Sequence, residues 1–382
     1  MNEQAAFVAT FELGTLRAGG ATVGVKDCID IAGMPTSGGS RALASAAPAT
    51  AHADVVRLLL DAGWKIVGKT NMHELAYGMT GINPWTGTPR NPQDPALIPG
   101  GSSSGSAAAV GAGLVDMALG SDTGGSIRMP AACCGVIGLK PTFGRVSRAG
   151  AHPPHSTLDC VGPLARSMDR LIAAMAVIAP DFKLGAARQP QAQARVRLVH
   201  CDSDPAIATA LGHAVARSGW DIGHAVLPGM REAFEAGMVL INAETAQAFG
   251  HLADSGAVQA DVAQRLRLGS VVTAEQRARA ERVRTDFSSE VDRALVHADA
   301  LVLPTLPQLP PTLAAVNAGL PVLGLSALIR PFNLSGHPAI TLPLPLPATH
   351  LKAGLQLVGR KGEDEKLCAL ALHLERALRA MT

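Results

Sequence analysis

The feature that most constrains this chain is a run of small residues over positions 99–141, PGGSSSGSAAAVGAGLVDMALGSDTGGSIRMPAACCGVIGLKP. Two glycine and serine clusters, at 100–106 and 121–126, flank an alanine-rich segment that suits a buried helix. Glycine lets a backbone approach a ligand closely, and serine supplies hydroxyl groups. We expect the fold to bring the two clusters together, with a nucleophile in the second cluster and an activating group in the first.

Composition narrows the class of partner. The 382 residues are 47% hydrophobic and 17% charged, so the chain can bury a large core. A formal net charge of +2 and an aromatic content of 3% give neither the basic surface nor the stacking side chains that nucleic-acid binding uses. These numbers favour small-molecule chemistry and predict no nucleic-acid partner.

The sequence has no pattern typical of export, membrane insertion or metal binding. Its first residues lack a basic segment ahead of an apolar run, and no apolar stretch approaches the ~20 residues of a membrane span. The six cysteines form no CxxC pair, which argues against structural zinc and a disulfide framework. We therefore predict a cytoplasmic protein with reduced thiols, no metal, no cofactor and no membrane contact.

Strand and helix patterns alternate along the chain. The patterns predict strands at 6–11, 22–31, 64–70, 194–200 and 298–305, and helices at 52–63, at 168–179 and from about 364 to 381. Residues 205–300 are alanine-rich and predicted to be mainly helical. Alternating units of this kind favour an α/β fold whose sheet is covered on both faces. No repeat or linker divides the chain, so we expect one domain over residues 1–382.

Lys26 lies in an apolar run with Val25, Cys28 and Ile29, although the chain contains only eight lysines. A strand end at which the amine reaches solvent accounts for this position. A buried amine that acts as a base accounts for it as well. The residues alone leave both interpretations open.

Three interpretations fit the glycine and serine clusters. A serine can cap the alanine-rich helix, and a glycine loop at a helix start can bind phosphate, although the P-loop pattern GxxxxGK[ST] is absent. The third is acyl transfer by Ser126, because the backbone N–H groups of Thr123, Gly124, Gly125 and Ser126 can converge on an oxyanion. A serine nucleophile needs a base, and the GxSxG pattern of α/β-hydrolases is absent, so Lys26 becomes a candidate base.

Four segments together carry a resemblance to a known family. They are GVKDCIDIAGMPT, PGGSSSGSAAAVGAG, GSDTGGSIRMPAACCGVIGLKPTFGRVS and FNLSGHPAITLP. The chain resembles the amidase signature family from about residue 22 to residue 375. The resemblance implies a three-layer α/β/α sandwich with a large central mixed sheet. Because the chain starts almost at its first strand, we expect it to lack the helical N-terminal arm of the family.

The resemblance also implies a catalytic triad of serine, cis-serine and lysine. By position, Ser126 is the nucleophile, Ser102 is the bridging serine after a cis peptide bond from Gly101, and Lys26 is the base. The backbone at 123–126 is the family's oxyanion hole. For Lys26 to accept a proton, its pKa must lie well below the ordinary value of about 10.4.

Further residues beside the triad have two interpretations each. Asp122 and Arg128 are expected to form an internal ion pair that stiffens the loop, with substrate recognition as the alternative. Ser103 is either a helix cap or a hydrogen-bond partner of the triad. The family's pocket wall corresponds to Ala76, Tyr77 and Gly78. Tyr77 can instead be a core aromatic, and the loops after Pro304 and at 333–337 are expected to complete the pocket.

The sequence therefore predicts an amidohydrolase that cleaves the C–N bond of a small carboxamide or urea-type substrate through a seryl acyl-enzyme, releasing ammonia or an amine. Two alternatives are a glutaminase A-type subunit of a tRNA-dependent amidotransferase and a catalytically inactive assembly subunit. The expected partner is the small-molecule amide, and a homodimer is compatible with the resemblance. Retention of Lys26, Ser102 and Ser126 together argues against the inactive subunit.

Overall fold

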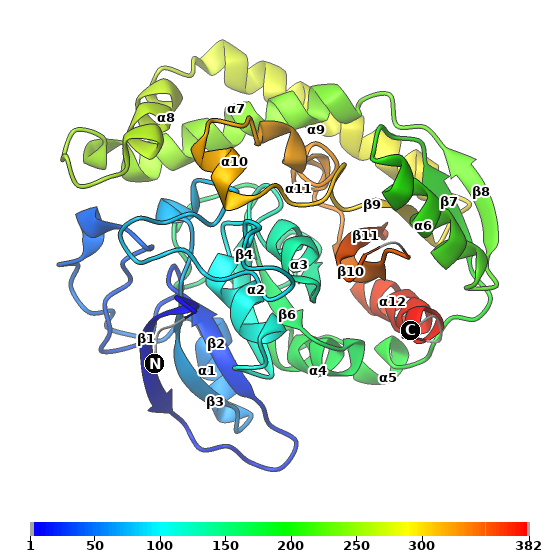
Figure 1. Ribbon diagram of the computed structural model, residues 1–382, viewed down its shortest axis with the longest axis horizontal. Helices are drawn as coiled ribbons and strands as arrows, with labels where there is room; N and C mark the ends of the chain where they lie inside the picture. Colours follow the sequence, from blue (N-terminus) through cyan, green and yellow to red (C-terminus); the bar gives the residue numbers. More distant parts are fainter. Residues whose placement is uncertain (1–3, 348, 380–382) are drawn as a thin grey trace.

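The computed structural model describes residues 4–347 and 349–379. Its central feature is an 11-stranded sheet with the strand order β1-β3-β2-β4-β6-β5-β10-β11-β9-β7-β8 (Figure 1). The strands are β1 (Phe7–Leu13), β2 (Thr22–Lys26), β3 (Lys65–Thr70), β4 (Met117–Asp122), β5 (Ile137–Lys140), β6 (Cys160–Ala165), β7 (Arg195–Val199), β8 (Asp221–Ala225), β9 (Ala300–Pro304), β10 (Ala339–Pro345) and β11 (Lys352–Val358).

Helices connect most of these strands. The α-helices are α1 (Asp54–Asp61), α2 (Ser104–Gly111), α3 (Arg128–Cys134), α4 (Met168–Ile178), α5 (Leu184–Ala187), α6 (Pro205–Ala216), α7 (Met230–Phe249), α8 (Ala260–Ser270), α9 (Ala274–Leu295), α10 (Leu313–Asn317), α11 (Pro331–Leu334) and α12 (Asp364–Arg379). Short 3-10 helices span Arg41–Leu43, Glu74–Ala76, Gly250–Leu252 and Leu323–Ser326.

The sheet is mixed, and its parallel part positions the glycine and serine clusters. β2 runs parallel to both β3 and β4, whereas β4 pairs antiparallel with β6. Parallel neighbours end at the same edge of a sheet. The last residues of β2 and β4, Lys26 and Asp122, therefore leave the sheet at one edge.

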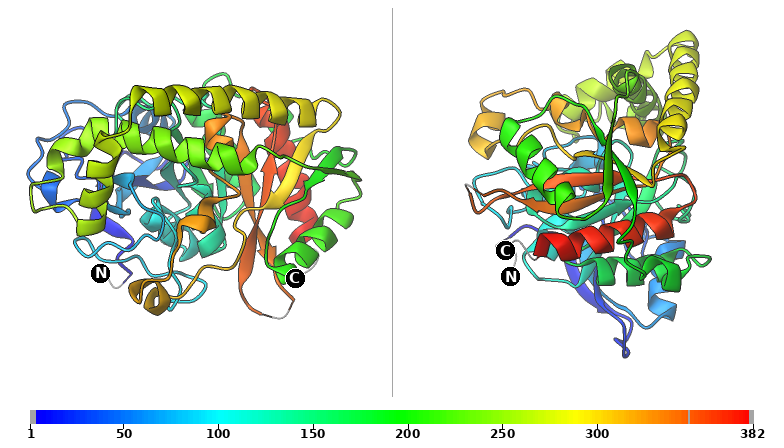
Figure 2. Two further views of the ribbon diagram at one scale, coloured as in Figure 1. Left: turned by 90° about the horizontal axis from the view of Figure 1, so that it is seen from above. Right: turned by 90° about the vertical axis from the view of Figure 1, so that its right-hand side faces the viewer.

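Helices cover both faces of the sheet. In β4, Ala118 packs with the alanines of α2, whereas Met117 and Leu119 belong to a core cluster that includes α4 and α12. In β9, Leu301 belongs to a cluster with α7 and α9. Figure 2 shows α4 and α12 on one side of the sheet and the long helices α7 and α9 on the other. The predicted α/β/α sandwich with a large mixed sheet is confirmed.

One predicted strand is too long. The apolar run at 22–31 indicated a single strand, but β2 ends at Lys26 and the chain then turns, with the Ile29 N–H donating to the Lys26 carbonyl at 2.9 Å. The apolar side chains beyond the turn still enter the core, with Ile29 fully buried, so hydrophobicity alone did not mark the strand end. Across the described ranges, no helix is long and apolar enough to cross a membrane.

Candidate active site

Lys26 is fully buried at the end of β2 and does not reach solvent. Its Nζ lies 2.8 Å from Ser102 Oγ and 2.8 Å from Ser121 Oγ. It lies 3.5 Å from the carbonyl oxygen of Ser121. The strand-end interpretation is therefore correct for the backbone and wrong for the side chain, because the amine turns inward to two serine hydroxyls.

The surroundings of Lys26 disfavour its charged form. Burial lowers the pKa of Lys26 from its ordinary value, and this desolvation outweighs the opposing effects of Cys28, Asp159 and Asp122. A neutral lysine has a lone pair, so it can accept a proton from one hydroxyl while donating to another. The two serine contacts match these two roles.

Ser102 and Ser103 occupy the start of α2, the alanine-rich helix. The peptide bond between Gly101 and Ser102 is cis, as the resemblance implied. The Ser103 hydroxyl makes no helix-capping bond. Instead it donates to the carbonyl of Ser121 at 3.2 Å, and the Ser103 N–H donates to the carbonyl of Ser126 at 3.1 Å. Ser103 therefore joins the two serine clusters, and the capping interpretation is wrong.

Ser126 is half-buried in the loop between β4 and α3. The loop is fixed by Asp122, whose two carboxylate oxygens accept from Arg128 Nε and Nη2 at 3.0 Å each. Asn333 donates to the same carboxylate at 2.8 Å, and both ionic side chains are fully buried. Arg128 holds the pKa of Asp122 well below its usual range, against the effect of desolvation. This is the internal ion pair expected from the sequence.

The predicted oxyanion hole has fewer open donors than expected. The Gly125 N–H donates to Asp122 Oδ1 at 2.8 Å, so the carboxylate that fixes the loop already uses it. Within residues 4–347 and 349–379, the N–H groups of Thr123, Gly124 and Ser126 have no protein acceptor. These three are the donors left for a developing oxyanion. The sequence could not reveal that Asp122 accepts from the Gly125 N–H, because this hydrogen bond depends on the conformation of the turn.

The predicted pocket wall at 76–78 has a strained backbone at its start and is held in place by a hydrogen bond from Tyr77. Leu75 and Ala76 have φ values of +53° and +55°, in the left-handed region that non-glycine residues rarely adopt. Tyr77 is 2% exposed, and its hydroxyl donates to Asn242 at 2.6 Å. Tyr77 therefore packs as a core aromatic. Ala76 and Gly78 are half-buried, and their substrate-binding role stays a prediction.

Two buried polar residues to which the sequence assigned no role in the triad lie beside the serines. Ser121 is a partner of Lys26 and also lies 3.6 Å from the Cys28 thiol. The His73 N–H donates to the Ser102 carbonyl at 3.0 Å, and burial lowers the pKa of this histidine to about 4. The sequence signal for Ser121 was its place in the second glycine and serine cluster, and its pairing with Lys26 required the structure.

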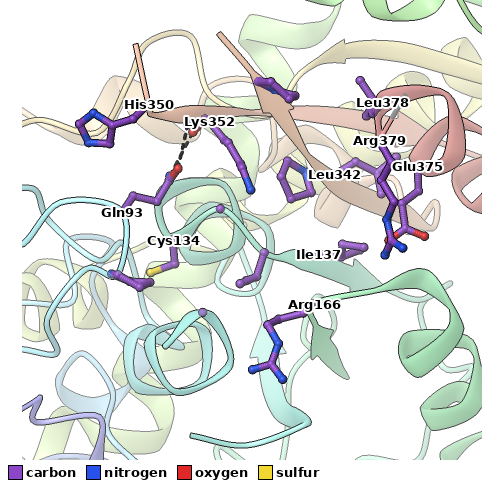
Figure 3. A pocket seen from close by; sticks show the side chains of 16 residues that line it. Gln93, Cys134, Ile137, Arg166, Leu342, His350, Lys352, Glu375, Leu378 and Arg379 are labelled. Carbon is purple, nitrogen blue, oxygen red and sulfur yellow. Dashed lines mark hydrogen bonds and ion pairs between the residues drawn. The ribbon is translucent and has the colours of Figure 1, made fainter. Parts of the chain in front are cut away.

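A cavity of about 500 Å³ lies at the opposite ends of α2 and α3 from these serines. Gly111 and Cys134, the last residues of the two helices, line it together with Gln93, Arg166 and Lys352 (Figure 3). None of the three predicted triad residues lines this cavity. It is therefore separate from the candidate active site.

Comparisons with known proteins identify the family and the fold of this chain. The Amidase family model matches residues 9–368. The chain is 33% identical over 413 residues to the A-type subunit of glutamyl-tRNA(Gln) amidotransferase from Synechococcus sp. (strain RCC307), covering 95% of this chain and 84% of the relative. A crystal structure of an amidase is similar with a TM-score of 0.82 and 33% identity, covering 94% of this chain and 84% of the other. 6-Aminohexanoate cyclic dimer hydrolase, solved with substrate, matches with a TM-score of 0.82, 25% identity and the same coverage.

Proposed function

Because this chain belongs to the amidase family of hydrolases acting on C–N bonds, we propose that it hydrolyses a small carboxamide or urea-type substrate through an acyl-enzyme on Ser126. The observation that carries the proposal is the buried contact of 2.8 Å between Lys26 Nζ and Ser102 Oγ. The neighbouring backbone N–H of Ser103 donates to the Ser126 carbonyl, which ties the loop of Ser126 to the segment that carries Ser102.

In the proposed cycle, Ser126 Oγ attacks the amide carbonyl carbon while its proton passes through Ser102 to neutral Lys26. The tetrahedral intermediate carries its negative charge toward the open N–H groups of Thr123, Gly124 and Ser126, which lower the barrier by hydrogen bonding. The C–N bond then breaks as Lys26 returns the proton through Ser102 to the leaving nitrogen. Water repeats these steps on the acyl-enzyme, releasing the carboxylic acid and restoring the Ser126 hydroxyl.

A glutaminase subunit is the second candidate function. It is favoured by the 33% identity to an amidotransferase subunit over most of both chains. The same chemistry serves both candidates, since each begins with attack by Ser126 on an amide. They differ in whether the chain works on small amides alone.

The test is a panel of small amides and ureas, with glutamine included, in which ammonia or amine release by the purified protein is measured. We expect turnover of at least one small amide without added proteins, and its loss in Ser126→Ala. Ser104→Ala is the matched control, because Ser104 is a buried serine in the same cluster whose hydroxyl has no partner in the described chain. Turnover of glutamine only with partner proteins would favour the glutaminase, and full activity in Ser126→Ala would contradict both.

A further inference from the structure

Arg330 is a buried cation without a hydrogen-bond partner for much of its guanidinium. The residue is 5% exposed, and its Nε and Nη1 atoms are buried with no acceptor in the described chain. Arg128, by contrast, donates to Asp122, Asn333 and Gln356. Buried polar groups are normally satisfied, so the open guanidinium of Arg330 needs an explanation.

Arg330 lies against the loop that carries the nucleophile. Its Nε is 3.2 Å from the position that a Cβ on Gly124 would occupy, and Gly124 is two residues before Ser126. On another side, the Arg330 side chain comes within 3.1 Å of the corresponding position on Gly237 in α7. The two glycines leave room for the arginine, and its Nε lies beside Gly124 in the predicted oxyanion loop.

The charges around Arg330 do not neutralise it. Across the described residues, no carboxylate forms an ion pair with it, and its guanidinium lies 4.5 Å from the centroid of the Phe234 ring. Burial and the neighbouring positive charge of Arg265 lower the pKa of Arg330 to about 9, although Tyr77 opposes them. Most of the guanidinium population is still charged at neutral pH. The contact with an aromatic ring recovers only part of the hydration free energy that a buried cation loses.

The second arginine nearby, Arg265, is already engaged. Its guanidinium lies 4.0 Å from the ring centroid of Tyr77 and donates to the Tyr77 carbonyl. It therefore adds positive potential beside Arg330. A buried guanidinium with unpartnered N–H donors is suited to an anionic hydrogen-bond acceptor, such as a carboxylate.

We propose that Arg330 binds a carboxylate on the substrate, so that the preferred substrates are amides that carry an anionic group near the scissile bond. This inference rests on the proposed amidase function, because it assigns the non-reacting part of the same substrate. Arg330 acts as a specificity-determining residue that holds the amide carbonyl over the donors of Gly124 and Ser126.

The test compares matched pairs of amides. Malonamate, succinamate and glutaramate each carry a carboxylate, and propanamide, butanamide and pentanamide are neutral amides of the same length. We expect kcat/KM for at least one anionic amide to exceed that of its neutral match by tenfold or more. Arg330→Gln should abolish this preference, mainly by raising KM for the anionic amide. Arg231→Gln is the control, since Arg231 is an exposed arginine on α7 with its side chain 89% exposed.

A second measurement does not depend on turnover. Binding of succinate and glutarate, the products of two of these amides, is measured by calorimetry on the wild type, Arg330→Gln and Arg330→Met. We expect at least tenfold weaker binding in both variants, with their melting temperatures unchanged or raised because an uncompensated buried charge is gone. Equal binding in folded variants, or equal turnover of the anionic and neutral amides, would overturn the role of Arg330. If no amide acylates Ser126, the proposed function is rejected instead. The calorimetric binding of succinate and glutarate then still tests whether Arg330 binds a carboxylate.

Discussion

Lys26 and Lys69 are two buried lysines on neighbouring parallel strands with different partners. Lys69 is 2% exposed on β3, and its Nζ lies 3.2 Å from Asp27 Oδ1 in an ion pair of which both side chains are buried. Lys26 is fully buried on β2, and its close contacts are the hydroxyls of Ser102 and Ser121. Lys69 also donates to the Pro35 carbonyl at 2.7 Å.

The difference shows that burial alone does not make a lysine a base. A carboxylate within about 4 Å stabilises an ammonium, whereas hydroxyls offer hydrogen bonds without a compensating charge. Lys69 is therefore built as half of a structural ion pair. The proposed mechanism requires Lys26 to be neutral, and burial lowers its pKa in that direction.

Replacing each lysine by methionine gives the largest expected contrast. Lys26→Met should lower kcat/KM by about 10²–10⁴, the usual contribution of a general base, and should cost about 1–3 kcal/mol of stability because the buried hydroxyls of Ser102 and Ser121 lose a partner. Lys69→Met should keep the wild-type kcat/KM but lose about 3–5 kcal/mol of stability, because Asp27 becomes a buried unpaired charge. Amidase kinetics give kcat/KM of both variants, and urea denaturation gives their free energies of unfolding. Activity in Lys26→Met equal to wild type would contradict the comparison.

Removing the hydroxyl of Ser102, the proposed relay from Ser126 to Lys26, should have the next largest effect. Ser102→Ala breaks the proton path, and we expect a fall in kcat of about 10²–10³ with KM changed little. Ser104→Ala is the control in the same helix. Equal falls in the two variants would show that the loss comes from packing of α2 and not from the relay.

Placing a carboxylate beside Lys26 should make it resemble Lys69. In Ser121→Asp, the new negative charge lies where the Ser121 hydroxyl is 2.8 Å from Lys26 Nζ, so the pKa of Lys26 should rise. Only the neutral amine accepts a proton, and it is populated above its pKa. The rise of kcat/KM with pH should therefore move to higher pH, with about tenfold lower activity at neutral pH for each pKa unit of the shift. Urea denaturation tests folding, and an unshifted profile in a folded variant would contradict this explanation.

Removing the carboxylate from the Lys69 pair should leave catalysis almost unchanged. Asp27→Asn should cost about 3 kcal/mol of stability, since it leaves the buried ammonium of Lys69 uncompensated. The pH at which kcat/KM rises should stay within a few tenths of the wild-type value. A large shift of this profile would show that Asp27 also controls the charge of Lys26.

Much of this arrangement could be predicted from the sequence. The small-residue run at 99–141 predicted two serine loops around a buried helix, and α2 is buried along nearly its whole length. The scarcity of lysine made Lys26 conspicuous in an apolar run. The assignment of Lys26 as base required the family resemblance, because strand patterns do not show which way a side chain turns at a strand end.

The rest depends on contacts between residues far apart in the chain. Ser121 pairs with Lys26 only because β2 and β4 are parallel neighbours, and strand patterns do not reveal the strand order. The use of the Gly125 N–H by Asp122 depends on the conformation of one turn, in which Gly125 has φ of +113°. Arg330 is a charged residue in an apolar segment, the same signal that drew attention to Lys26, and its lack of partners required the structure.

The most direct test of the central claim is the rate at which a sulfonyl fluoride labels Ser126 as a function of pH, followed by mass spectrometry with peptide mapping. We expect one adduct, on Ser126, with a rate that rises with pH through a transition below the ordinary pKa of lysine, because Lys26 must be neutral to accept the proton. In Lys26→Met the rate should be low and lack this transition. An adduct on another residue, or the same pH profile in both proteins, would contradict the account.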